Sequence, residues 1–139
     1  MIAPERGWPL WCEFLLLIAL TALALGMRFY HLGDSIHMLV DEAHFVLGVN
    51  YARLFPDLRL LEPMPTTASF PFLFSYGQAL MVDVFGRNLL GLRALSAILG
   101  ALTVPATYWL GRELFDRPTA LIGALVLMSF PPHLHYSRL

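Results

Sequence analysis

The chain has 139 residues, of which 58% are hydrophobic and 14% are charged, and its mean hydropathy is +0.64. An ordinary soluble domain is less apolar than this, so the composition predicts an integral membrane protein. The nine basic residues are all Arg and ten residues are acidic, which gives a net charge of -1 and excludes the basic surface that nucleic-acid binding requires. Cys12 is the single cysteine, which excludes an intrachain disulfide and a cysteine metal cluster.

Three segments have the length and hydropathy of membrane-spanning helices. A bilayer core of roughly 30 Å requires about 20 helical residues, and the sequence predicts spans at about 10–29, 89–110 and 118–132. Glu13 and Arg28 lie near the two ends of the first span, where we expect their charged groups to reach the membrane interface. Pro105 predicts a kink in the second span, and two consecutive prolines close the third.

Two alternative interpretations of the apolar segments stay open. Residues 70–85 form a fourth apolar stretch, but Asp83 within it would cost about 2.5–3.5 kcal/mol near the bilayer centre. We therefore interpret 70–85 as an interfacial or re-entrant helix, with a true fourth span as the alternative. The first span also has small residues at 22–26 that are typical of signal-peptide cleavage sites, although its amino end is only weakly basic, which favours a retained anchor.

The arginines of the short connections indicate the orientation in the membrane. Arg112 and Arg117 lie in the tight turn between the second and third spans, which favours a cytoplasmic turn and a cytoplasmic amino terminus. Residues 30–88 then form a long extracytoplasmic loop. This loop carries three arginines of its own, which oppose the assignment, but long loops cross the membrane with less regard to charge.

The long loop has helical segments of its own. Apolar residues recur at helical spacing over 42–54, which predicts an amphipathic helix lying along the membrane, with Phe45, Val46, Val49 and Leu54 on its apolar face. Prolines at 63 and 65 predict a stiff polar connector before the helix at 70–85. The fold class predicted is all-α: about three transmembrane helices, with amphipathic or re-entrant helices in the first extracytoplasmic loop.

The acidic pair Asp41–Glu42 is the strongest indication of function, because it stands just outside the first span. A carboxylate held there can take the proton of a nucleophile that attacks a lipid-linked substrate, so Asp41 and Glu42 are candidate catalytic residues. Both could instead cap the helix that follows. His44 lies near the same helix face and Arg138 follows the third span, which makes them candidate substrate-binding residues; Arg138 could hold a phosphate or reach lipid headgroups.

Metal binding is left open by the sequence. A hard divalent cation would accept the oxygen ligands of Asp41 or Glu42 and could bridge them to a phosphate. His133 and His135 flank one residue, but two histidines without a third ligand are weak evidence, and a polar belt at the membrane boundary explains them equally well.

The serial order of several short motifs resembles the amino-terminal part of the C-type glycosyltransferases. An apolar span is followed by residues 28–33 and then by Asp41–Glu42–Ala43 and an outer helix. The later motifs at 85–86, 92–97, 110–115 and 131–138 resemble the protein mannosyltransferase and aminoarabinose transferase branch. Each motif is short, and the resemblance is carried by their order and spacing over nearly the whole chain.

The resemblance implies a multi-pass enzyme of the plasma membrane that transfers a sugar from a polyprenyl phosphate to an acceptor protein, lipid or glycan on the extracytoplasmic face. It assigns the role of catalytic base to Asp41, with Glu42 beside it. Because members of this family have many more spans, the resemblance also implies that these residues are an amino-terminal portion. A transporter, flippase or membrane scaffold is the alternative, and spans nearly free of ionisable residues count against transport.

Overall fold

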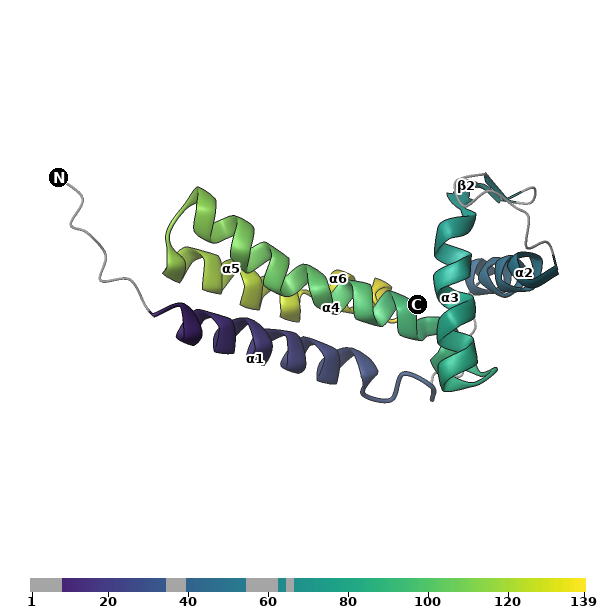
Figure 1. Cartoon of the computed structure of the whole chain (residues 1–139), viewed down its shortest axis with the longest axis horizontal. Helices are drawn as coiled ribbons and strands as arrows, with labels where there is room; N and C mark the ends of the chain where they lie inside the picture. Colours follow the sequence, from purple (N-terminus) through teal and green to yellow (C-terminus); the bar gives the residue numbers. More distant parts are fainter. Residues whose placement is uncertain (1–8, 35–39, 55–62, 65–66) are drawn as a thin grey trace.

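The computed structural model describes residues 9–34, 40–54, 63–64 and 67–139 of the chain. Three long helices lie side by side: α1 (Leu10–Phe29), α4 (Leu89–Leu114) and α5 (Arg117–Ser129), with the short helix α6 (Pro131–Tyr136) continuing from α5 (Figure 1). Helix α4 runs antiparallel to both neighbours. The end of α1, the start of α4 and the carboxyl end of the chain consequently lie at one end of this bundle.

The remaining elements gather at that same end. Helix α2 (Val40–Leu54) packs on α3 (Phe72–Phe85), which runs across the direction of the bundle and contacts α4. Between α2 and α3, β1 (Pro63–Met64) pairs antiparallel with β2 (Thr67–Pro71). The predicted helical class is confirmed, whereas this small hairpin stands where the sequence predicted only a stiff connector, since prolines are admitted at a sheet edge.

Two of the helices are long and apolar enough to cross a bilayer by length and composition: Trp11–Phe29 and Leu89–Leu114. Helix α5 has 13 residues and reaches about 20 Å, short of a hydrocarbon core. The chain leaves the helical conformation at Phe130, before the Pro131–Pro132 pair begins α6. The third predicted span, the predicted kink at Pro105 and the membrane orientation stay predictions.

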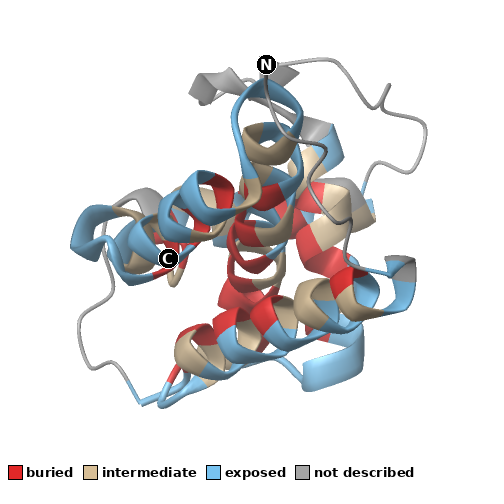
Figure 2. Cartoon of the chain, turned by 90° about the vertical axis from the view of Figure 1, so that its left-hand side faces the viewer, coloured by how far each residue is buried: buried red, intermediate tan, exposed pale blue. Residues whose placement is uncertain are grey.

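Small side chains let the bundle helices approach closely. Residues Ala24, Ala101 and Ala124, one from each long helix, have no exposed surface and face one another in the centre of the bundle. Figure 2 looks along the bundle and shows the buried residues on the facing sides of the helices. Close backbone approach of this kind is the usual basis of helix association in membranes, where burial of large apolar groups brings little gain.

Side-chain caps close the amino ends of α4 and α5. Asn88 accepts a hydrogen bond from the Gly91 amide at the start of α4, at 2.8 Å. Asp116 does the same for the Thr119 amide at the start of α5, at 2.9 Å. Hydrogen bonds from the side chain and backbone of Thr119 hold the pKa of the Asp116 carboxyl below its usual value. These caps fix where α4 and α5 begin.

Glu13 is buried within the bundle, which the sequence did not predict. Its side chain is 3% exposed, and Arg112 lies 2.6 Å and Arg117 3.6 Å from its carboxylate oxygens. The Tyr108 hydroxyl donates to the same carboxylate at 3.2 Å. The sequence gives the position of Glu13 along its helix. It does not show that two arginines from a later part of the chain pair with this carboxylate inside the bundle.

The contact between α3 and α4 predicts a strong effect of one added methyl group. A Cβ at Gly91 would overlap the carbonyl oxygen of Gly86 and lie 3.1 Å from the Cα of Val82, which are backbone atoms that cannot move independently. Gly91→Ala should therefore destabilise the protein by about 1–3 kcal/mol, the usual cost of overpacking. The matched control is Gly123→Ala in α5, where a Cβ would meet nothing within 4 Å.

We expect Gly123→Ala to leave the thermal unfolding midpoint unchanged or to raise it, because Ala is the better helix former. The midpoints of both variants and of the natural chain are measured in the same detergent. Equal midpoints for Gly91→Ala and the natural chain would contradict the close packing of α3 on α4.

Candidate functional site

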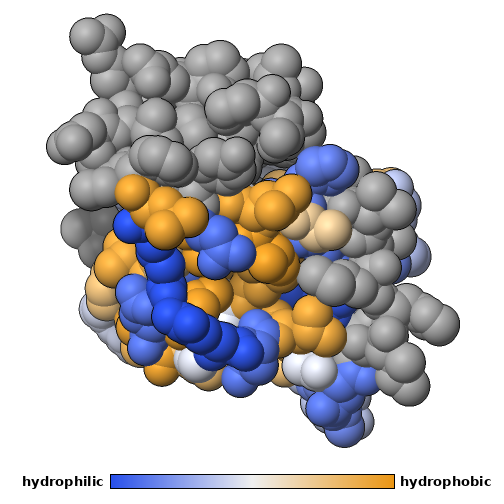
Figure 3. Space-filling model, turned by 90° about the vertical axis from the view of Figure 1, so that its right-hand side faces the viewer, coloured by the Kyte–Doolittle hydropathy of each residue, from blue (hydrophilic) through white to orange (hydrophobic). Residues whose placement is uncertain are grey.

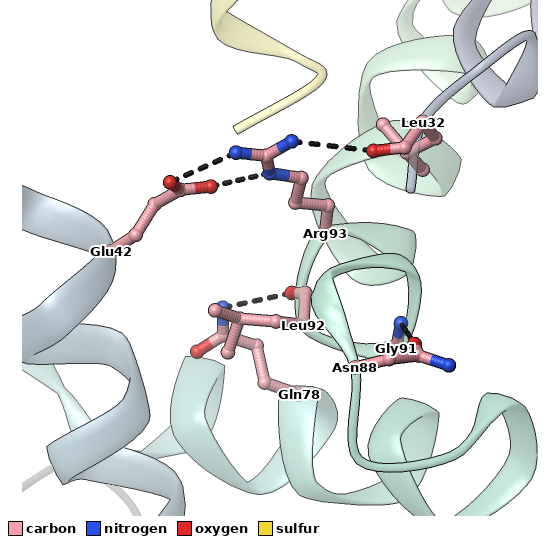
Figure 4. A network of polar contacts seen from close by, with 7 residues as sticks. All are labelled: Leu32, Glu42, Gln78, Asn88, Gly91, Leu92 and Arg93. Atoms are coloured by element: carbon pink, nitrogen blue, oxygen red, sulfur yellow. Dashed lines mark hydrogen bonds and ion pairs between the residues drawn. The ribbon is translucent and has the colours of Figure 1, made fainter. Parts of the chain in front are cut away.

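A buried ion pair holds α2 against the start of α4. Glu42 and Arg93 come from these two helices, and their side chains are each 1% exposed. Both carboxylate oxygens of Glu42 accept hydrogen bonds, Oε1 from Nε of Arg93 and Oε2 from Nη2 at 2.9 Å (Figure 4). The remaining arm of the guanidinium, Nη1, donates to the Leu32 carbonyl oxygen at 3.3 Å. One arginine thus joins α4 to α2 and to the turn after α1.

The neighbouring residues reinforce the same junction. The amide of Gln78 in α3 donates to the Leu92 carbonyl oxygen at 3.2 Å, and Gln78 is fully buried (Figure 4). Val49 of α2, Ala79 of α3 and Leu92 of α4 form a small apolar cluster beside it. A polar network surrounded by such a cluster is shielded from water, which strengthens its hydrogen bonds.

Arg28 occupies the interior of the bundle rather than the membrane interface, which corrects the expectation from the sequence. It is fully buried at the end of α1, where Nε donates to the Ser137 hydroxyl at 2.9 Å and Nη1 to the Ala24 carbonyl oxygen at 3.1 Å. Its Nη2 has no hydrogen-bond partner. Gly100 of α4 makes room for this side chain, since a Cβ there would lie 3.1 Å from Nε of Arg28.

Arg138 directly follows Ser137, the hydrogen-bond partner of this buried arginine. Its Nη2 donates to the Tyr30 carbonyl oxygen at 2.5 Å, which fastens the segment after α6 to the turn after α1. Arg28 and Arg138 bind neutral oxygens, and within the described part of the chain no carboxylate pairs with either. Two guanidinium groups are therefore held at the same end of the bundle, and the described residues give neither a neutralising acid.

Asp41 and His44 belong to the first turn and a half of α2. Asp41 is the second residue of the helix and precedes the buried Glu42, but its side chain lies outside what the structure describes. His44 is half-buried. Because Glu42 contacts Arg93 at the start of α4, the backbone of Asp41 lies at the same end of the bundle as Arg138. The functions predicted for Asp41, Glu42, His44 and Arg138 stay predictions.

Sequence reasoning did not anticipate the importance of Arg28 and Arg93. The structure turns both inward, so the inference that the spans are nearly clean of ionisable residues holds for their centres and not for their ends. The available signal was an arginine within or at the edge of an apolar segment, which usually faces protein and has a partner. Among the described residues, no group of three potential metal ligands converges; the Asp41 side chain, a candidate cation ligand, lies outside the described part of the chain.

Comparison with known proteins gives one family. The family model described as dolichyl-phosphate-mannose-protein mannosyltransferase matches residues 69–139, just over half of the chain. The matched part holds Arg93 and Arg138, whereas Arg28, Asp41 and Glu42 precede it. Comparison with curated proteins and with solved structures gave no significant match.

The ion pair predicts strongly non-additive substitutions. Arg93→Met leaves the buried Glu42 carboxylate without its guanidinium, which should cost about 3–5 kcal/mol, and Glu42→Leu should cost a similar amount. The double variant replaces both charges by apolar groups and should recover most of the loss, because no uncompensated charge remains. Thermal unfolding of the four proteins in one detergent measures the cycle. Two single losses that simply add in the double variant would contradict direct pairing.

Proposed function

Since the chain belongs to the dolichyl-phosphate-mannose-protein mannosyltransferase family, a family of membrane-embedded glycosyltransferases, we propose that it transfers a sugar from a polyprenyl phosphate to an acceptor at the extracytoplasmic membrane face. The observation that carries this proposal is that the acidic start of α2 lies at the same end of the bundle as two arginines, Arg28 and Arg138, for which the described residues provide no carboxylate partner. An acid that accepts a proton and cations that hold a phosphate are the two groups that this transfer requires.

Asp41 is proposed as the general base. An acceptor hydroxyl or amine attacks the anomeric carbon of the sugar, the bond from this carbon to the phosphate oxygen breaks, and Asp41 takes the acceptor's proton. A positioned base of this kind typically contributes about 10²- to 10⁴-fold. The position of Asp41 in the second residue of α2 supports the assignment, because the next residue is fixed by the buried pair.

Glu42 is proposed to position this base. Both of its oxygens are occupied by Arg93, and it has no exposed surface, so it is poorly placed to take a proton from an acceptor itself. By binding the first turn of α2 to α4, it holds the backbone of Asp41 in place. His44 lies two residues further along the helix, and we propose that it contacts the sugar or the acceptor.

Arg138 is proposed to bind the phosphate of the donor. One of its guanidinium nitrogens holds the Tyr30 carbonyl, which fixes the side chain while leaving N–H groups for a second partner. Arg28, which binds the preceding residue Ser137, adds a positive charge that no described carboxylate neutralises. The departing polyprenyl phosphate carries the negative charge that these groups would stabilise, preferably through paired hydrogen bonds to a guanidinium.

Two arginines beside the short turn between α4 and α5 support an extracytoplasmic site in a multi-pass protein of the plasma membrane. Arg112 in the last turn of α4 and Arg117 at the start of α5 lie at the opposite end of the bundle from Asp41, where the excess of positive charge on the cytoplasmic side would place them. Arg28 and Arg93 lie at the other end, but both are buried within protein and do not count as loop charges. The three arginines of the long loop still oppose this assignment, but long loops cross the membrane with less regard to charge.

Replacement of the base should abolish transfer without unfolding the protein. Asp41→Asn keeps the shape and the capping capacity of the side chain but removes its basicity, so transfer should fall at least 10²-fold. Transfer of radiolabelled mannose from its polyprenyl phosphate is followed in membranes that contain equal amounts of each variant. Asp34→Asn, in the turn after α1, removes a carboxylate at the same end of the bundle and serves as the control. Wild-type transfer by Asp41→Asn would remove the base assignment.

Replacement of the phosphate ligand should act on the donor. Arg138→Ala removes the guanidinium and should raise the KM for the polyprenyl-phosphate sugar about tenfold or more, while the KM for the acceptor changes little. Arg138→Lys retains the charge without the planar fork and should recover part of the loss. Arg117→Ala, at the opposite end, is the control. An unchanged donor KM in Arg138→Ala would count against the phosphate role.

A further inference from the structure

A cleft of about 350 Å³ lies between α2, the end of α3 and the start of α4. One wall is apolar and consists of Val46, Val49, Val82, Leu89 and Leu92. The other residues that line the cleft are polar or basic: Asn50, Arg53, Arg87 and Asn88. The lining therefore combines an apolar surface with two cations and contains no acidic residue.

Two ion pairs hold the helix that borders this cleft. Glu42, Val46, Val49 and Arg53 are spaced by four, three and four residues, which places them along one face of α2. Glu42 at one end of this stripe binds Arg93, and Arg53 at the other end pairs with Asp83 of α3. Helix α2 is thus fixed at both ends of the stripe, and the two valines between them face the cleft.

The charge of the cleft remains available to a ligand. Arg87 is exposed, and the described part of the chain offers it neither a hydrogen bond nor an ion pair. Arg53 contacts Asp83 through Nη2 alone, and Asp83 is itself 64% exposed and outside the lining. An anion at the mouth of the cleft would therefore meet two guanidinium groups.

The cleft is separate from the groups proposed for sugar transfer. Glu42, Arg93 and Arg138 do not line it. Leu92 faces the cleft while the next residue, Arg93, faces Glu42, as expected for consecutive residues that point about 100° apart around a helix. A ligand in the cleft would accordingly lie next to the buried ion pair without contacting it.

Exposed apolar residues also lie on the outer surfaces of α2 and α3. Leu54 at the end of α2 and Leu80 and Val84 on α3 are 72%, 63% and 70% exposed. Figure 3 views the molecule from the end that carries α2 and α3, and hydrophobic and hydrophilic residues lie side by side there. Surfaces of this composition are suited to the boundary between lipid headgroups and acyl chains.

We propose that this cleft binds an anionic phospholipid of the surrounding bilayer. The phosphodiester lies between Arg53 and Arg87, and an acyl chain lies along the wall formed by Val46, Val82 and Leu89. Charge complementarity favours an anionic headgroup, because the lining carries two positive charges and no negative one. By filling the space between α2 and α4, the lipid reinforces the position of α2 further along the helix face that carries Glu42.

Binding is tested on the full chain, purified in detergent and titrated with phosphatidylglycerol while native mass spectrometry counts the bound lipids. Arg87→Gln should weaken phosphatidylglycerol binding about fivefold, the effect of one basic residue at an anionic headgroup. Val46→Gln places a polar group on the apolar wall and should also weaken binding. Arg117→Gln removes the same charge at the opposite end of the bundle and should have no effect, and Arg138→Ala should bind as the natural chain does.

Competing ligands distinguish the source of the anion. Phosphatidylcholine and inorganic phosphate should bind at least fivefold more weakly than phosphatidylglycerol, because the first carries a compensating cation and the second has no chain for the apolar wall. Equal losses for Arg87→Gln and Arg117→Gln would show general surface attraction and overturn the proposal. Displacement of phosphatidylglycerol by an equimolar polyprenyl phosphate, with the same dependence on Arg87, would also overturn it and would give the cleft to the sugar donor.

Discussion

Glu42 and Arg93 form an ion pair from which water is excluded, and three segments of the chain depend on it. The guanidinium uses two arms for the carboxylate of α2 and the third for the Leu32 carbonyl oxygen. A charge buried without its partner costs several kcal/mol, so any rearrangement that moves α2 away from α4 is strongly unfavourable. The pair therefore defines the position of the first turn of α2, which carries the proposed base.

The positions of the helices could largely be predicted, because length, hydropathy and proline act locally. The helix expected at 10–29 is α1, and the helix expected at 70–85 is α3 from Phe72 onward, because residues 70 and 71 belong to β2. The direction of the charged side chains could not be predicted in this way. Arg28 and Glu13 turn inward because each has a hydrogen-bond partner more than 90 residues away, Ser137 for Arg28 and Tyr108 of α4 for Glu13. A local sequence pattern does not show such partners.

The candidate site shows the same division between local and distant information. Asp41 and Glu42 are predicted as candidate catalytic residues because they form a carboxylate pair next to a span. That prediction uses neighbouring residues alone. The position of this carboxylate pair in the fold depends on Arg93, which lies 51 residues after Glu42 and binds it. The proposed phosphate ligand Arg138 is brought to the same end of the bundle by its contact with the turn after α1. The family match covers the two arginines and not the acids, so the ion pair joins the matched part of the chain to the segment before it.

The bundle differs in charge balance between its two ends, and this difference bears on the proposed function. At the end near Glu13, one buried carboxylate faces two arginines, so the buried acid is neutralised by residues of the bundle itself. At the other end, Glu42 neutralises Arg93, but Arg28 and Arg138 have neutral partners. Like charges repel each other, and the residue that binds Arg28, Ser137, directly precedes Arg138 in the chain. A phosphate at Arg138 would relieve this repulsion, so donor binding and the closure of this end of the bundle would stabilise each other.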